Sequence, residues 1–410
     1  MKPIGVAPGA RRNAAALALG AILLLATACG PGGGSNAGSG DDGKPGGGST
    51  STSDTVASTA VVNIAPKDGA GDVATTGTLK VSASGGKLES VTVKDDKGST
   101  VPGDISSDGL GWTPSDHLST STEYTVDAVA KDAAGRESDK HSTFTTVTPK
   151  DTFVGFFTPE DGSTVGVGME VYLNFNRPIT NKKAVEQGVT VTASPSVPVA
   201  AHWYGDQQLY IRPADYWAAG TKVTLDLNLN GVEGAPGVYG KQHKQVHFTI
   251  ARRQVSIVDA AKHTMTVYRD NKVLRTIPIS SGAPEHTTYN GKMVISEKYL
   301  TTRMNGDTVG FGGEYDIKDV PHAMRLTNSG TFIHGNYWAA TSVFGNSNTS
   351  HGCVGLHDVR GAGDATTPAA WFYNSSIIGD VVQVVNSKDK TVQWYNGLNG
   401  WNLPWTEWTA

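Results

Sequence analysis

The chain repeats itself once at a domain-sized period. The stretch APKDGAGDVATTGTLKVSAS at 65–84 resembles TPEDGSTVGVGMEVYLNFN at 158–176, and STFTTV at 142–147 resembles VHFTIA at 246–251. The offset is 93 residues for the first pair (158 − 65) and 104 for the second (246 − 142). Solenoid repeats are about 20 to 50 residues long, so this longer period indicates two copies of a folded domain.

Within each copy, apolar and polar residues alternate over short stretches such as LKVSA, VTVKD and VTLDLN. This alternation is typical of strands that bury one face, and Gly, Pro, Asp and Asn clusters mark the turns between them. Both copies resemble bacterial immunoglobulin-like β-sandwich modules, at 55–148 and 149–251. Several rings of the second copy either line a ligand groove or lie in the core, the more common place: His202, Trp203, Tyr204, Tyr216 and Trp217.

The first residues resemble a bacterial lipoprotein leader. Basic residues precede the apolar run AAALALGAILLL at 14–25, which is too short for a bilayer-spanning helix of about 20 residues. The small residues of ATACG lead to Cys29, which we interpret as the lipidated first residue of the mature chain, so that 1–29 is leader and anchor. An ordinary cleaved signal peptide is the alternative, and under either interpretation the protein is exported.

Residues 30–54 contain ten glycines and no large apolar side chain, which predicts a flexible linker. The expected location is therefore the outer face of the cytoplasmic membrane, with a lipid anchor in the membrane and the folded part facing the cell wall. The formal net charge of −4 gives no sign of a nucleic-acid partner. We expect a monomer.

The last third continues with strand patterns and ends in a tryptophan-rich tail. The Gly-rich region at 282–313 is expected to be a long loop, part of which forms a lid or a wall for substrate. The tail tryptophans either bind glycan or pack the tail onto its domain, and packing is the more common use: Trp394, Trp401, Trp405 and Trp408.

One cysteine of this last third stands among histidines. Cys353 lies in TSHGCVGLHD at 349–358, and the other cysteine of the sequence is Cys29. Cysteines of exported proteins are commonly oxidised, so an unpaired thiol is either a reactive group or an inert buried side chain. An imidazole that takes the thiol proton makes cysteine a nucleophile, and the candidates are His334, His351 and His357.

The glycines around this cysteine predict a tight turn. Such a turn can direct the amides of Gly352 and Cys353 at one point and form an oxyanion site. His334 lies 19 residues earlier (353 − 334) on the strand-like stretch TFIHG, where the intervening loop can bring it opposite the thiol. It is the better candidate for the base, and His357 is expected at a turn or on the surface because one base suffices.

The pair IHG at 333–335 and TSHGCVGL at 349–356 resembles the signature of the L,D-transpeptidases of the YkuD type, which cross-link peptidoglycan. The resemblance covers about 252–385 as the catalytic domain, and 386–410 resembles the C-terminal subdomain of actinobacterial members. The expected fold is therefore mainly β, with two immunoglobulin-like modules, then a β-rich catalytic domain and a short C-terminal subdomain.

The resemblance implies a role for each matching residue. Cys353 resembles the acyl-forming nucleophile and His334 the base, with the amides of Gly352 and Cys353 as the oxyanion site. His351 matches a position that shapes the pocket. The residues implied to bind substrate are Met304, Tyr315, Gly335 and Ser350.

The chain departs from the family pattern at two positions. Related sequences often have serine after the first histidine and use its backbone carbonyl, which Gly335 retains without the side chain. They also commonly have asparagine where this chain has Gly355, so a contact from that side chain is in doubt.

The implied reaction is acyl transfer between peptidoglycan stem peptides. Cys353 attacks the third residue of a donor tetrapeptide, D-alanine leaves, and an amine of an acceptor stem takes the acyl group in a three-to-three cross-link. The resemblance also implies acylation by carbapenems. No cofactor and no metal ion are expected.

Three alternatives remain at this point. A zinc site at His334, His351, Cys353 and His357 is disfavoured, since one available cysteine does not give the paired spacings of structural zinc sites. A wall-anchored scaffold with an inactive domain is disfavoured because Cys353 and His334 are both present. Hydrolysis of the acyl-enzyme by an L,D-carboxypeptidase cannot be separated from transfer by sequence.

Overall fold

The computed structural model describes residues 56–410, and this part of the chain is mainly β, as predicted. The predicted leader with Cys29 and the predicted linker at 30–54 lie outside the described residues. Among the described helices, none is both long and apolar enough to span a lipid bilayer. Residues Ala57–Ala410 form one compact unit that contains four hydrophobic clusters.

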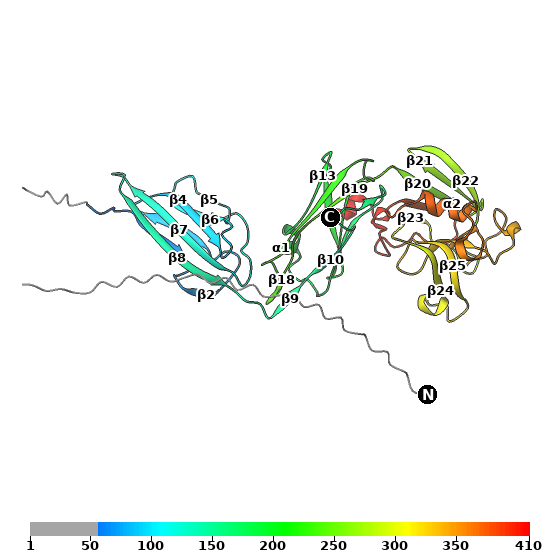
Figure 1. The fold of residues 1–410 in the computed structure, drawn as a ribbon, viewed down its shortest axis with the longest axis horizontal. Coiled ribbons are helices and arrows are strands. Elements are labelled where there is room, and N and C mark those ends of the chain that lie inside the picture. The colour runs from blue at the N-terminus through cyan, green and yellow to red at the C-terminus, as the bar shows by residue number, and fades with distance from the viewer. Residues whose placement is uncertain (1–55) are drawn as a thin grey trace, which may run out of the picture. The chain divides into compact units, whose positions relative to one another are not determined.

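The first module is a sandwich of two four-stranded sheets (Figure 1). In β7, the even-numbered residues from Tyr124 to Asp132 are buried, so the alternation in the sequence directs one face into the core. Trp112 of the opposite sheet packs in the same cluster. One sheet has the order β1 (Val61–Ala65), β3 (Lys80–Ser84), β6 (Gly111–Pro114) and β5 (Gly103–Ile105), and the other has β2 (Ala70–Val73), β8 (Glu137–Thr146), β7 (Glu123–Asp132) and β4 (Gly86–Asp95).

The second module repeats this topology strand for strand. In each module a short strand pairs in parallel with the last long strand, with Ala70 beside Phe144 in one and Thr164 beside Thr249 in the other. The sequence repeat is therefore a repeated sandwich. The sheets are β10 (Gly155–Thr158), β12 (Val171–Phe175), β15 (Gln208–Pro213), β14 (Val199–Tyr204), and β11 (Thr164–Val165), β19 (His243–Ile250), β16 (Lys222–Asn228), β13 (Val189–Ser194). Additions are α1 (Lys182–Gln187) and a small sheet of β17 (Glu233–Ala235), β18 (Val238–Gly240) and β9 (Asp151–Phe153).

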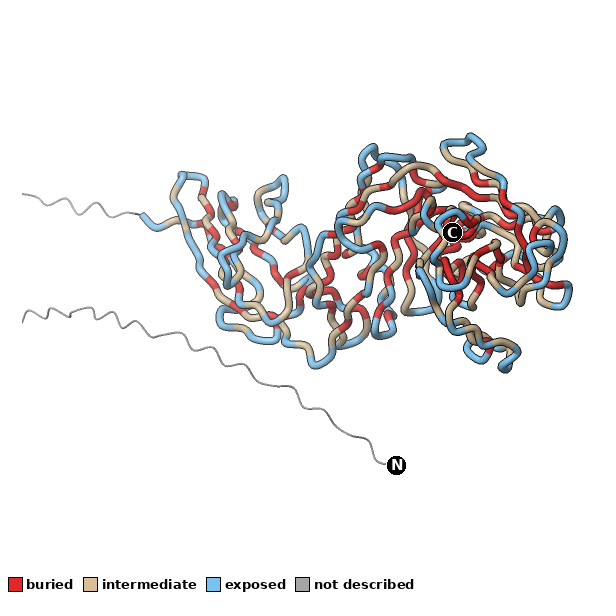
Figure 2. Tube along the Cα trace, turned by 45° about the vertical axis from the view of Figure 1, so that its right-hand side comes forward, coloured by how far each residue is buried: buried red, intermediate tan, exposed pale blue. Residues whose placement is uncertain are grey.

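A nine-stranded sheet forms the last part of the chain. Its order is β23 (Gly291–Val294), β28 (Val381–Val385), β20 (Gln254–Asp259), β21 (Thr264–Arg269), β22 (Lys272–Ser280), β27 (Val354–His357), β26 (Phe332–Asn336), β25 (Asp316–Arg325) and β24 (Glu297–Asn305). Helix α2 (Pro368–Ser375) packs Phe372 into the core of this sheet. Figure 2 shows that buried residues run through the strands of the chain, while exposed residues gather at the turns.

The region 282–313 is not the long loop that its glycines predicted. It contains β23, β24 and the 3-10 helix η1 (Gly306–Val309), and β24 pairs with β25 in a hairpin at 297–325. We call this hairpin the arm. Most residues of β24 are partly or fully exposed on both faces, so the period-two signal that marks a half-buried strand is weak there. The expected role as a substrate wall agrees with the cavity described below.

The C-terminal tail packs into the second module. Trp408 is 1% exposed and belongs to the hydrophobic cluster of that module. Its Nε1 donates a hydrogen bond to the carbonyl oxygen of Ala200 (2.9 Å), and Nε1 of Trp401 donates to that of Gly168 (2.8 Å). The guanidinium of Arg212 lies 4.2 Å from the ring centre of Trp408. These tryptophans therefore pack, as expected, but onto a neighbouring module; the segment includes η4 (Gly400–Asn402) and α3 (Trp405–Trp408).

Candidate active site

Two adjacent parallel strands bring the cysteine and the histidine together. β26 carries His334, and β27 begins one residue after Cys353. The register places His334 beside Gly355. Side chains two residues apart on a strand point to the same face of a sheet, so Cys353 lies on the same face as the Gly355 position. His334 is paired with Gly355, so His334 also points to that face. The long crossover between the strands is the kind that parallel pairing requires, and it contains η2 (Thr341–Val343).

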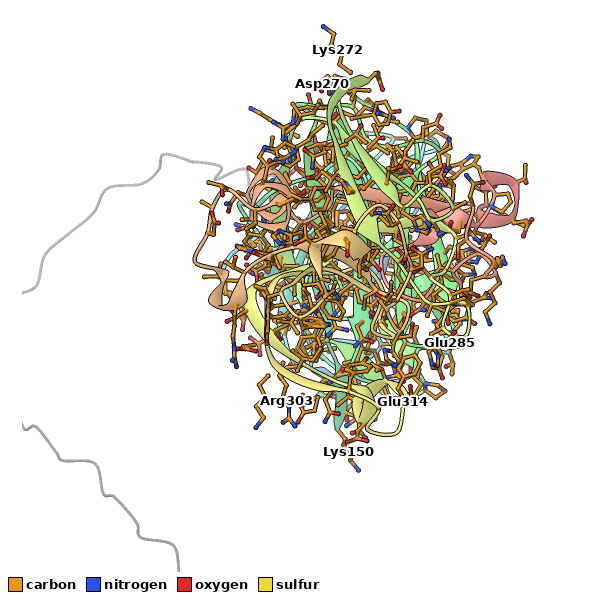
Figure 3. All side chains as sticks on the ribbon, turned by 90° about the vertical axis from the view of Figure 1, so that its right-hand side faces the viewer. Lys150, Asp270, Lys272, Glu285, Arg303 and Glu314 are labelled. Atoms are coloured by element: carbon orange, nitrogen blue, oxygen red, sulfur yellow. The ribbon has the colours of Figure 1, made fainter. Side chains whose placement is uncertain are left out.

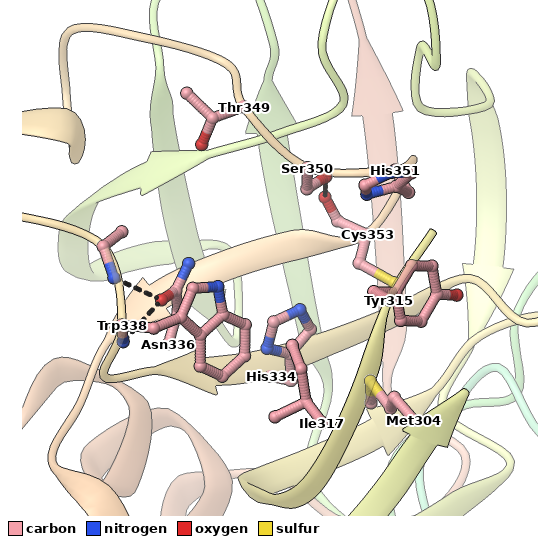
Figure 4. Close-up of a pocket in the computed structure, with 11 residues that line it drawn as sticks. Met304, Tyr315, Ile317, His334, Asn336, Trp338, Thr349, Ser350, His351 and Cys353 are labelled. Carbon is pink, nitrogen blue, oxygen red and sulfur yellow. Dashed lines mark hydrogen bonds between the residues drawn. The ribbon is translucent and has the colours of Figure 1, made fainter. Parts of the chain in front are cut away.

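Both side chains line one cavity of about 230 Å³ (Figure 4). Gly335 and Gly352 are the predicted site residues that do not line it, although both adjoin residues that do. Six predicted residues line it: Met304, Tyr315, His334, Ser350, His351 and Cys353. Sequence reasoning did not single out the other lining residues, which are Ile317, Asn336, Trp338, Ala339 and Thr349.

His334 is held as a neutral imidazole. Its Nδ1 lies 2.8 Å from the carbonyl oxygen of Gly335, which can only accept a hydrogen bond, so Nδ1 carries the proton and Nε2 keeps a free lone pair. Burial lowers the pKa of the imidazole below its ordinary value. The ring stacks on Trp338 with 5.6 Å between ring centres. The Gly335 carbonyl is thus a contact that orients the imidazole, while the substrate role implied for Gly335 stays a prediction.

The thiol of Cys353 is held by backbone groups at the start of β26 and just before it. Its Sγ accepts a hydrogen bond from the amide of Phe332 (3.4 Å) and lies 3.6 Å from the carbonyl oxygen of Gly330. Burial raises the pKa of the thiol to about 11. The resting cysteine is therefore protonated at neutral pH and needs a base to become a nucleophile.

The turn before the cysteine is fixed by Ser350. The hydroxyl of Ser350 donates to the carbonyl oxygen of Cys353 (2.6 Å) and accepts from the amide of Gly352 (3.2 Å). Gly352 has a φ of 108°, a conformation that favours glycine. Of the two amides predicted for the oxyanion site, that of Gly352 is engaged inside the turn, while that of Cys353 has no hydrogen-bond partner among residues 56–410.

The arm supplies the opposite wall of the cavity. Met304 lies near the end of β24 and Tyr315 directly before β25. Burial raises the pKa of the Tyr315 phenol to about 12, so the phenol is neutral and can donate a hydrogen bond. Met304 and Tyr315, both implied to bind substrate, thus line the cavity from the two sides of one hairpin, and their role stays a prediction.

The glycine after His334 is required by a buried, hydrogen-bonded His322–Asp358 pair. A side chain at Gly335 would collide with the carboxylate of Asp358. That carboxylate binds Nδ1 of His322 at 2.7 Å and accepts a hydrogen bond from Thr367 at 2.9 Å. Both residues of the pair are fully buried. The first departure from the family pattern therefore has a steric reason, and His322 has a structural partner that the sequence did not reveal.

Gly335→Ser is expected to lower the free energy of unfolding by about 1–3 kcal/mol, because the new side chain overpacks the site. Urea denaturation measures this loss. Gly363→Ser is the matched control, since the φ of Gly363 is −86° and a Cβ atom added there would meet nothing within 4 Å. The control is expected to change stability by no more than about 0.5 kcal/mol. Equal stability of the two variants would contradict the steric argument.

At the second departure, Gly355 in place of asparagine, the neighbouring strand β26 supplies an asparagine, Asn336. A Cβ atom at Gly355 would lie 3.5 Å from Cβ and from Nδ2 of Asn336. An amide side chain thus reaches this place from β26 instead of β27. Oδ1 of Asn336 accepts hydrogen bonds from the amides of Trp338 (3.1 Å) and Ala339 (3.0 Å). These bonds hold the Trp338 ring against His334.

The residues weighed as zinc ligands do not form a cluster. Within residues 56–410, the group that brings three possible ligand atoms together is His286, Glu314 and His351. His357 packs instead against Phe344, with 5.7 Å between ring centres. His351 lines the cavity, but its Nε2 binds Oε2 of Glu314 at 2.9 Å.

Two family models match the chain. A bacterial Ig domain matches residues 70–233, and an L,D-transpeptidase catalytic domain matches residues 253–384. L,D-transpeptidase 2 of Mycobacterium tuberculosis is 32% identical over 346 residues, which are 84% of this chain and 82% of the relative. L,D-transpeptidase 5 of the same species is 32% identical over 352 residues, 84% of this chain and 75% of the relative. A solved L,D-transpeptidase in complex with imipenem is 26% identical, with a TM-score of 0.48, and covers 58% of this chain and 100% of the solved one.

Proposed function

This chain belongs to the L,D-transpeptidase family, and on that premise we propose that it forms three-to-three cross-links between peptidoglycan stem peptides through a thioester on Cys353. It is an L,D-transpeptidase with immunoglobulin-like modules ahead of its catalytic domain. The observation that carries the proposal is that the protonated thiol of Cys353 and the neutral imidazole of His334 line the same cavity. That pair fits acyl transfer by a cysteine nucleophile.

The first half-reaction forms the thioester. Sγ of Cys353 attacks the carbonyl carbon of the third residue of a donor tetrapeptide, and Nε2 of His334 takes the thiol proton. The amide of Cys353 donates a hydrogen bond to the oxyanion that develops. The C–N bond to D-alanine then breaks, and His334 returns the proton to the departing amine.

The second half-reaction needs room for another stem. A second cavity of about 390 Å³ shares Met304 and Tyr315 with the first and is also lined by Gly330 and Phe332. The backbone of Gly330 and that of Phe332 contact the thiol of Cys353. Cys353 lines only the first cavity, but two residues that contact its thiol line the second, so we assign the second cavity to the acceptor stem. This supports transfer over hydrolysis.

The same nucleophile can open a β-lactam. The strained carbonyl of a carbapenem resembles the donor carbonyl, so the proposal includes a covalent adduct of a carbapenem with Cys353.

The proposed location of the protein is the outer face of the cytoplasmic membrane. The leader-like segment, Cys29 and the Gly-rich stretch at 30–54 support a lipid-anchored protein that faces the cell wall, and we propose that it is a monomer. Mass spectrometry of the mature N-terminus tests the anchor: an acylated Cys29 supports it, and an unmodified N-terminus further along the chain excludes it.

The test of the reaction uses a soluble form that begins at Ala57, the first residue of the compact unit. It is incubated with a disaccharide-tetrapeptide, alongside Cys353→Ala, and the products are read by mass spectrometry. Loss of D-alanine with a dimer joined between third residues is the expected result. Tripeptide without dimer would make the protein a carboxypeptidase, and dimer formation by Cys353→Ala would exclude the thioester.

A further inference from the structure

Three side chains from separate segments meet beside the catalytic cavity. Nε2 of His351 lies 2.9 Å and Nε2 of His286 lies 3.5 Å from the same oxygen, Oε2 of Glu314. One possible ligand atom of each residue lies within 4.8 Å of those of the other two. Glu314 lies at the periphery of the molecule, on the outer end of the arm (Figure 3).

His351 makes a good hydrogen bond to Glu314, but His286 does not. The 3.5 Å contact from His286 is longer than a normal N–H···O hydrogen bond, so the carboxylate oxygen binds one imidazole well and the other poorly. The two imidazoles stack at 4.8 Å between ring centres with their Nε2 atoms directed at one point. An ion held between the two Nε2 atoms and Oε2 would give all three groups a strong partner.

The distances suit a tetrahedral ion. With metal–ligand distances of about 2.1 Å, tetrahedral ligand atoms lie about 3.4 Å apart. The 3.5 Å contact matches this spacing and the 2.9 Å contact is shorter, while all three atoms lie within 4.8 Å of one another, so side-chain rotations would complete the geometry. Two histidines and one glutamate are a ligand set of zinc sites that keep a fourth position for water. Side-chain exposures of 28% for His286, 33% for His351 and 50% for Glu314 leave that position open to solvent.

The rings are held in place before any ion arrives. Phe311 of the arm packs edge-on against His286 (5.2 Å between ring centres) and against His351 (5.4 Å). Tyr315 lies 5.0 Å from His351 on the cavity side. Ligands that packing already orients lose little side-chain entropy when they bind a metal.

We propose that His286, Glu314 and His351 form a Zn²⁺ site with water as the fourth ligand. The ion would join the loop at 282–290, the arm and the turn that carries Cys353. It would therefore fasten the arm to the catalytic turn on the side of His351.

Binding of Zn²⁺ to the soluble form from Ala57 is measured by equilibrium dialysis, with no substrate present, so the result does not depend on the proposed reaction. One equivalent is expected for the wild type. Because loss of an outer contact of a metal ligand already weakens affinity by about 10- to 100-fold, His286→Ala and Glu314→Gln are each expected to weaken it by at least that factor. Zn²⁺ is also expected to raise the thermal midpoint of the wild type but not of these variants.

Two further variants identify the site. Cys353→Ala is expected to keep the Zn²⁺ equivalent, and His357→Ala, a matched histidine control in the same domain, is expected to keep it too. Loss of binding in Cys353→Ala would place the ion on the thiol and overturn the proposal. Undiminished binding in both His286→Ala and Glu314→Gln would overturn it as well. Thermal unfolding in the presence of a chelator checks the fold of each variant, and the exposed Glu314 provides a substitution with little cost to folding.

Discussion

Alanine at position 334 is expected to slow acylation of Cys353 at neutral pH by about 10²- to 10⁴-fold, the range that general base catalysis supplies. Burial holds the pKa of His334 below its ordinary value and raises that of the Cys353 thiol to about 11, so both groups are neutral in the resting enzyme. Without the imidazole of His334, the buried neutral group to which the proposal assigns the thiol proton is lost. Mass spectrometry of the carbapenem adduct under single-turnover conditions measures the rate.

The pH profile separates a lost base from a damaged fold. The wild-type rate is expected to fall only when the pH drops through the lowered pKa of His334, because protonation removes the base. The rate of His334→Ala is expected to rise steadily with pH towards the pKa of the thiol, since only hydroxide then forms the thiolate. His357→Ala is the control and should keep the wild-type profile. A His334→Ala enzyme with wild-type rate and profile would rule out this base.

Trp408→Ala is expected to lower the free energy of unfolding by about 3–5 kcal/mol, although the residue lies close to the end of the chain. Its ring is buried in the cluster of the second module and stacks on His202 at 5.0 Å between ring centres. Removal leaves a cavity and an unpaired carbonyl at Ala200. Urea denaturation followed by fluorescence and by circular dichroism measures the loss.

The neighbouring residue provides the control for this prediction. Glu407 is exposed, so Glu407→Ala is expected to change stability by no more than about 0.5 kcal/mol. If Trp408→Ala unfolds at the same urea concentration as Glu407→Ala, the tail does not contribute to the core of the second module.

The sandwiches could be predicted because their signal is local. In β7 and β16 nearly every second residue is buried, so the pattern of single side chains reveals the strand and its inward face. The repeat then gave the number of copies, and the observed sheets have the same strand order in both. The boundaries predicted for the individual domains stay predictions, because turn residues occur both within a module and between modules.

Cys353 and His334 could also be picked out from the sequence, because both lie in short motifs with distinctive neighbouring residues. The rest depended on contacts between distant segments. His351 and Glu314 are 37 residues apart, and Trp408 and Ala200 are 208 apart. No periodicity relates such residues, so only the fold could bring them together.

The tail has a consequence for the order of synthesis. The strands of the second module leave the ribosome well before Trp401 and Trp408, yet both rings belong to its core. Domains usually complete their folding one after another as the chain grows. Here the core of the second module is completed only by rings that follow the whole catalytic sheet in the chain. A chain that stopped before Trp401 would carry every strand of the module and still lack two rings of its core.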